Sequence, residues 1–246
     1  MKRGLPLALA ISILGASYAP TMAMTGATQS GSPAQNAIVM LLKSDARGSS
    51  FCTAVVIAPD VLITAAHCVK PPAELLAYWP GGRLDQMPRA EKIAIHPQYR
   101  ADAPKTRERS IDVALVQLSA PVARPYTPIE IDYQPKISVG TPFLVSGYGV
   151  SIEKDGRTGG TLRSAQLVTR EPLSKLLIWA KDSQSHQTGA CTGDSGGPFI
   201  SPEGKLVGII VWSQGAGNKA CGELTQALRL DAVSDFIQTT LRNWSR

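Results

Sequence analysis

After its first 23 residues, the sequence lacks any apolar run long enough to cross a lipid bilayer, which takes about 20 residues. The N-terminal segment has Lys2 and Arg3 before the apolar stretch LPLALAISILGASYA, the pattern of a secretory signal peptide. We predict residues 1–23 as this peptide and residues 24–246 as an exported protein, secreted or periplasmic, without a membrane segment. Cleavage could follow Ala19 or Ala23. Pro20 disfavours the first site, so Met24 is the predicted mature N-terminus.

Charge is also scarce, at 18% of residues. The formal net charge of +6 becomes +4 once the cations Lys2 and Arg3 are removed with the signal peptide. The remaining basic residues are scattered, with one local cluster at KTRERS (105–110). This pattern gives little support to nucleic-acid binding, for which we expect a concentrated basic surface.

Cysteine is limited to Cys52, Cys68, Cys191 and Cys221, and no Cys-x-x-Cys pair is present. In an exported protein an even number of cysteines indicates disulfides, and four cysteines allow three pairings. Pairing sequence neighbours gives Cys52 with Cys68 and Cys191 with Cys221, each stabilising the fold by about 3–4 kcal/mol. A metal site at Cys52, His67 and Cys68 is the alternative. Without a Cys-x-x-Cys pair we expect no metal.

Short runs rich in Val, Ile and Leu recur between Gly, Pro and Asp, which predicts an all-β chain. The predicted strands cover residues 37–43, 52–58, 61–66, 113–119, 143–149, 164–170 and 206–212. Helical spacing is convincing only near the C-terminus, where one face carries Val233, Phe236, Ile237, Thr240 and Leu241. Many short strands and one terminal helix favour barrels or a sandwich.

Histidine is scarcer still, with three in the chain. Ser195 stands in CTGDSGGPFI (191–200), and a serine hydroxyl needs a neighbouring base to act as a nucleophile. His67, in LITAAHCV, follows an apolar strand and adjoins a cysteine, so its backbone should be held rigidly. His96 and His186 lie in loop-like segments, which predicts exposed side chains.

A base of this kind is best oriented by a buried carboxylate. Asp112, in SIDVALVQL, stands at the head of the most apolar predicted strand. Asp85 and Asp102 lie among polar residues and prolines, which predicts solvated loop carboxylates.

The segments LITAAHCV, IDVALVQL and CTGDSGGPF, in this order and spacing, resemble the chymotrypsin/trypsin-like serine peptidases over most of the mature chain. FLVSGYG (143–149) and LVGIIVWS (206–213) are similar to further strands of that family. The resemblance implies two six-stranded antiparallel β-barrels, residues 24–135 and 136–230, followed by a C-terminal helix. The active site would lie between the barrels.

The resemblance also implies roles for individual residues. Ser195 would attack a peptide carbonyl, His67 would act as general base and then general acid, and Asp112 would orient His67. The N–H groups of Gly193 and Ser195 would form the oxyanion hole. The partners would be protein or peptide substrates, with no cofactor, no metal and no nucleic acid, and the enzyme would be a monomer.

The N-terminus departs from the family pattern. Most relatives expose an Ile-Val-x-Gly terminus whose ammonium pairs with the acid before the serine, which here is Asp194. No such motif is present. We hypothesise that signal cleavage frees Met24 to make this pair.

The substrate-binding residues depart as well. Gly189 occupies the pocket floor, where a carboxylate would select Arg or Lys. The pocket wall resembles Val211, Trp212 and Ser213, with Thr225 opposite. Ser213 and Thr225 stand where wider pockets have glycine, which predicts cleavage after small or medium apolar residues.

Two other functions share parts of these motifs. A binding protein on a protease scaffold is one, although such relatives usually lose a member of the triad. An exported carboxylesterase or lipase is the other, because GDSGG matches Gly-x-Ser-x-Gly. The chain order His, Asp, Ser disfavours this second class, in which the serine comes first.

Overall fold

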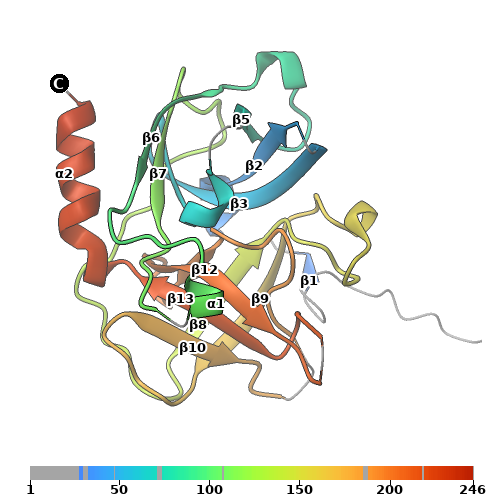
Figure 1. Cartoon of the computed structure of the whole chain (residues 1–246), viewed down its shortest axis with the longest axis vertical. Helices are drawn as coiled ribbons and strands as arrows, with labels where there is room; N and C mark the ends of the chain where they lie inside the picture. The colour runs from blue at the N-terminus through green and yellow to red at the C-terminus, as the bar shows by residue number, and fades with distance from the viewer. Residues whose placement is uncertain are drawn as a thin grey trace, which may run out of the picture.

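Two antiparallel β-sheets build the molecule, as a computed structural model shows (Figure 1). The structure describes residues 28–29, 33–46, 48–70, 74–106, 108–184, 188–217 and 219–245. No helix in these ranges is long and apolar enough to cross a membrane. The predicted signal peptide and Met24 lie outside the described residues.

The first sheet has six strands in the order β5-β2-β3-β4-β7-β6. They are β2 (Ile38–Asp45), β3 (Gly48–Ala58), β4 (Val61–Thr64), β5 (Glu74–Tyr78), β6 (Ala90–Ile95) and β7 (Ala114–Leu118). An isolated bridge between Leu76 and Arg89 draws β5 towards the segment that leads into β6. The sheet therefore curls into a barrel around a core of side chains such as Val39, Leu62 and Val116.

The second sheet comprises β8 (Pro142–Gly147), β9 (Arg163–Thr169), β10 (Leu177–Lys181), β11 (Pro198–Ile200), β12 (Leu206–Gln214) and β13 (Leu224–Arg229). The pairing of β8 with β9 closes these six strands into a barrel. The two-residue β1 (Thr28–Gln29) adds to the outer edge of β9. The predicted all-β architecture of two six-stranded antiparallel barrels is confirmed, and the division near residue 135 stays a prediction.

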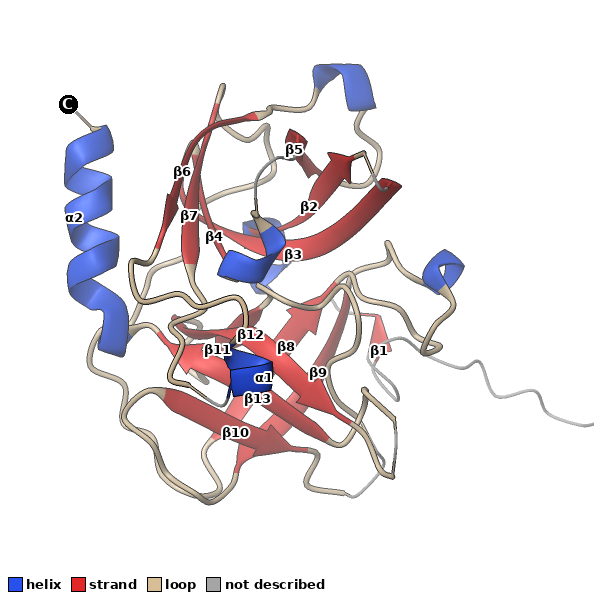
Figure 2. Ribbon diagram, in the orientation of Figure 1, coloured by secondary structure: helices blue, strands red, loops and turns tan. Residues whose placement is uncertain are grey.

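Short helices complete the chain. They are α1 (Ala103–Thr106), α2 (Ser234–Trp244) and the 3-10 turns η1 (Pro33–Ala37), η2 (Ala66–Cys68), η3 (Leu84–Gln86), η4 (Gly156–Thr158) and η5 (Asp231–Val233). Figure 2 shows α2 standing beside β6 and β7 of the first barrel. Val233, Ile237 and Thr240 are buried, as the helical spacing predicted.

A third core cluster joins the two barrels. It brings together Val55, Ile63 and Leu115 from the first barrel and Leu206 and Ile209 from the second, and α2 adds Ile237. Because this interface is apolar and fully buried, the loops that meet along it have a fixed relative position. Those loops carry the candidate site.

Candidate active site

His67 and Asp112 meet because β4 and β7 are antiparallel neighbours. Thr64, at the end of β4, is paired with Ala114, at the start of β7. The chain therefore leaves β4 and enters β7 at the same end of the barrel, where residues 67 and 112 lie. His67 follows in η2 and Asp112 in the segment that enters β7.

Two contacts fix the histidine on the carboxylate. The His67 backbone N–H donates to Asp112 Oδ1 at 2.9 Å, and His67 Nδ1 lies 2.7 Å from Asp112 Oδ2. An ionised carboxylate can only accept, so this second contact puts the ring proton on Nδ1 and leaves Nε2 free to accept. The His67 side chain is 37% exposed and that of Asp112 is 19% exposed. The His67 ring is thus open to a ligand, while the Asp112 carboxylate is partly shielded.

Ser195 lies in the turn before β11, and hydrogen bonds to both barrels fix the backbone of this turn. Its carbonyl accepts from the Thr53 N–H of β3 at 2.9 Å, and the next residue, Gly196, donates to Ile210 O of β12 at 2.7 Å. No hydrogen bond joins Ser195 Oγ to His67 within the described ranges. Such bonds often tighten only when substrate binds.

Gly193 has φ of +96°, a left-handed conformation that suits glycine. A Cβ here would lie 2.3 Å from the Phe51 ring and 3.0 Å from Gly149 Cα, so the site also excludes a side chain sterically. Among the described residues, the N–H groups of Gly193 and Ser195 have no protein acceptor. Both remain available to an oxygen atom of a ligand.

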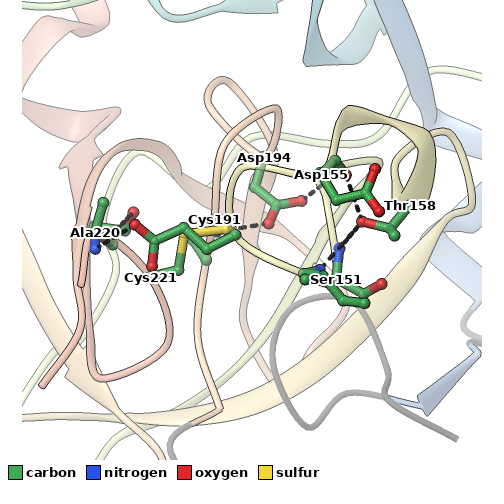
Figure 3. Close-up of a disulfide and its surroundings, with 12 residues drawn as sticks. Ser151, Asp155, Thr158, Cys191, Asp194, Ala220 and Cys221 are labelled. Carbon is green, nitrogen blue, oxygen red and sulfur yellow. Dashed lines mark hydrogen bonds between the residues drawn. A yellow bond between two sulfur atoms is a disulfide. The ribbon is translucent and has the colours of Figure 1, made fainter.

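Asp194 is completely buried behind this turn. Gly149 N–H donates to its Oδ1 at 2.7 Å and Cys191 N–H to its Oδ2 at 2.8 Å (Figure 3). Gly147 and Gly149 leave room for this carboxylate, because a Cβ on either residue would overlap it. No described Lys, Arg or His nitrogen lies within ion-pair distance of Asp194. Burial raises the pKa of Asp194 to about 7, opposed by the two N–H donors and by the charge of Arg163.

Comparison with known proteins fits this geometry. Residues 26–237 match the family model described as Trypsin. The chain belongs to the trypsin family of serine peptidases. It is 28% identical to Kallikrein-11 of Homo sapiens over 211 residues, which are 78% of this chain and 72% of the relative.

Two solved structures share the fold of this trypsin-family chain. One is GrC, with a TM-score of 0.71 and 20% identity over 88% of this chain and 99% of its own. The other is neuropsin, a serine protease expressed in the limbic system of mouse brain, with a TM-score of 0.65 and 21% identity. It covers 82% of this chain and 93% of its own.

The candidate substrate pocket of this trypsin-family chain lies between β12, β13 and the segment before Cys191. Ser213 and Thr225 are direct cross-strand partners. Thr225 is fully buried, and its Oγ1 accepts from Ala190 N–H at 2.9 Å. A Cβ on Gly189 would lie 3.1 Å from that same oxygen, so Gly189 and Thr225 are in close contact.

The wall of the pocket continues along β12. Ser213 Oγ donates to Ala220 O at 2.9 Å, tying this strand to the segment before Cys221. Trp212 is 43% exposed, an unusual exposure for a large apolar residue. Val211, beside it, is half-buried. Gly189, Ser213 and Thr225 thus lie together, whereas Val211 and Trp212 line the groove that also contains His67.

Both disulfides pair sequence neighbours, as predicted. Cys52 in β3 is bonded to Cys68 in η2, beside His67, and Cys191 is bonded to Cys221. The sulfurs of Cys52 and Cys68 lie close to His67, but their bond leaves no thiolate to hold a metal ion. Figure 3 shows the Cys191–Cys221 bond next to Asp194, so it braces the turn that carries Ser195.

A groove of about 660 Å³ extends from His67 between the barrels. Apolar side chains of Leu176, Trp179 and Trp212 line it, together with Tyr99. Burial, assisted by the charge of Asp112, raises the pKa of Tyr99 to about 12, which keeps its hydroxyl protonated. Tyr99 was not predicted from the sequence, because a single tyrosine in a polar loop gives no sign of which residues surround it.

Of the other candidates, those in the described ranges make no hydrogen bond or ion pair with His67, Asp112 or Ser195. His96 is a half-buried loop residue whose ring contacts Phe236 of α2, with 4.9 Å between ring centroids. Asp85 is paired with Arg83 at the surface, and Asp102 is exposed. His186 lies outside the described residues.

Proposed function

We propose that the chain is an exported serine endopeptidase that cleaves peptide bonds through His67, Asp112 and Ser195 and an acyl-enzyme intermediate. The observation that carries this proposal is the double contact of Asp112 with His67 beside a serine turn in which two N–H groups have no acceptor among the described residues. A base in the correct tautomer, a nucleophile and donors for a developing oxyanion are what acyl transfer requires.

In the first half of the reaction, His67 Nε2 takes the proton of Ser195 Oγ as that oxygen attacks the carbonyl carbon. The N–H groups of Gly193 and Ser195 stabilise the negative oxygen of the tetrahedral intermediate. The protonated His67 then gives its proton to the leaving amine, and the C–N bond breaks. Asp112 keeps the imidazolium in place and stabilises its charge.

In the second half, a water molecule takes the place of the amine. His67 removes a proton from the water as it attacks the acyl ester. The same two N–H groups stabilise the second intermediate, and the proton returns to Ser195 Oγ as the acid product leaves.

The residue before the cleaved bond should be small or medium-sized and apolar. Gly189 places no carboxylate in the pocket to pair with Arg or Lys, while the side chains of Thr225 and Ser213 narrow it. Met24, freed by signal cleavage, would supply the ammonium that pairs with Asp194. The depth at which Asp194 is buried supports a need for such a partner.

Labelling with a fluorophosphonate tests the proposal. The wild-type protein should gain one adduct by intact mass, the Ser195→Ala variant none, and the control Ser201→Ala should label as the wild type does. Absence of an adduct on folded, disulfide-bonded wild type would contradict a peptidase activity and favour a binding role.

A further inference from the structure

Thr53, in β3, is a fully buried polar residue that contacts the serine turn of the other barrel. Its Oγ1 donates to Gly193 O at 2.9 Å, across 140 positions of the sequence. Its backbone N–H donates to Ser195 O at 2.9 Å. One residue of the first barrel therefore contacts both residues whose N–H groups would stabilise the oxyanion.

Gly193 needs such contacts because glycine has more backbone freedom than any other residue. The peptide before it is fixed by Val150 N–H, which donates to Thr192 O at 2.9 Å. The peptide after it is fixed by the Thr53 hydroxyl. With a hydrogen bond on each side, the direction of the Gly193 N–H is determined without contact from a side chain of its own.

The hydroxyl of Thr53 is suited to this position because it both donates and accepts. While donating to Gly193 O, it accepts from Tyr148 N–H at 3.0 Å. The carbonyl of Thr53 also accepts from Thr64 Oγ1 at 2.8 Å, and Thr64 ends the strand that leads to His67. These bonds connect the oxyanion-binding turn to the strand that positions the base.

We propose that Thr53 is a positioning residue, which through its hydroxyl holds the Gly193 N–H in the direction that binds the oxyanion. This inference rests on the proposed function. It concerns the transition state, because the oxyanion forms only then, and the binding of substrate in the ground state does not depend on it.

The test compares Thr53→Val, which keeps the shape and loses the hydroxyl, with Thr53→Ser, which keeps the hydroxyl. Rates are measured on a peptide substrate and divided by the concentration of active sites titrated with fluorophosphonate. We expect kcat of Thr53→Val to fall about ten- to a hundred-fold, somewhat less than for loss of a whole oxyanion donor, with KM changed less than about threefold. Thr53→Ser should stay within about threefold of the wild type.

A peptide boronic acid separates positioning from stability. Its tetrahedral adduct places an oxygen where the oxyanion would lie, so its affinity should fall in Thr53→Val by the same factor as kcat. The affinity for a cleaved product peptide should stay unchanged. If Thr53→Val does not fold, Thr53→Ala replaces it, because this variant removes the hydroxyl without putting a methyl group against Gly193 O.

The inference is overturned if hydroxyl-free variants keep kcat and boronic acid affinity within about twofold of the wild type per active site. It is equally overturned if Thr53→Ser loses as much as Thr53→Val. An inactive wild type would instead refute the proposed function, so the two failures are distinct.

Discussion

At the scale of single residues, Asp112 contacts both the ring and the backbone of His67. Replacing one oxygen of this carboxylate should therefore impair the proposed base. In Asp112→Asn, an amide NH₂ can face Nδ1 and favour the wrong tautomer. We expect kcat to fall about 10⁴-fold, as for this change in a trypsin-like triad, with little change in melting temperature.

Steady-state kinetics on a peptide substrate measure this effect. Asp102→Asn is the matched control, because it changes an exposed carboxylate in a neighbouring loop and should leave kcat unchanged. A loss of less than tenfold in Asp112→Asn would mean that another group orients His67.

The sequence predicted His67, Asp112 and Ser195 because each lies in a local pattern of distinctive residues, and the structure brings His67 and Asp112 into contact. The sequence did not reveal Thr53 or Tyr99. Thr53 occupies an ordinary strand position, and its partner Gly193 is 140 residues away. Which strand residue faces the other barrel depends on how the two barrels pack, and no local pattern encodes that.

At the scale of elements, the pairing of β12 with β13 brings together the residues of the proposed substrate pocket. Ser213 bonds Ala220 O at its wall, and Thr225 contacts Gly189 at its floor. We expect the wild type to cleave after small or medium apolar residues. Ser213→Gly removes side-chain volume from the wall, so kcat/KM for substrates with Phe or Leu before the cleaved bond should rise about tenfold.

A peptide library profiled with both proteins checks this prediction. Ser201→Gly, on the segment after β11, is the control and should leave the profile unchanged. Strict cleavage after Arg or Lys by the wild type would show that another acid reaches the pocket. The residues assigned to the pocket would then be wrong.

The sequence predicted seven of the strands from their apolar runs and missed β1, β5, β6, β10, β11 and β13. These strands are short or carry polar residues between apolar ones, as β13 does with its LTQALR sequence. In such strands the partner supplies much of the stability, so the strand signal is weak in isolation. Helix α2 was predicted because mostly apolar residues recur at helical spacing on one face, and the structure buries that face.

At the scale of the whole molecule, the second barrel and the serine turn enclose Asp194, whose carboxyl has a pKa raised to about 7 by burial. The folded protein then binds this proton more tightly than the unfolded chain, whose carboxyl has an ordinary pKa near 3.9. The contribution of Asp194 to the free energy of unfolding is therefore fully present below about pH 4 and is lost as the pH rises to about 7. Above that pH the free energy of unfolding no longer changes through this group. An ammonium beside Asp194 would lower its pKa and remove this fall.

Two forms of the protein separate these cases, one beginning at Met24 and one carrying an additional alanine before Met24. If Met24 pairs with Asp194, only the first form should be active. Urea unfolding between pH 4 and 7 should show the loss of stability in the extended form alone, and Asp194→Asn should abolish the difference between the two. Equal activity in both forms would exclude the Met24 pair. Since Arg163 already acts on Asp194 through its charge, Arg163→Gln would then be expected to deepen the loss of stability across this pH range.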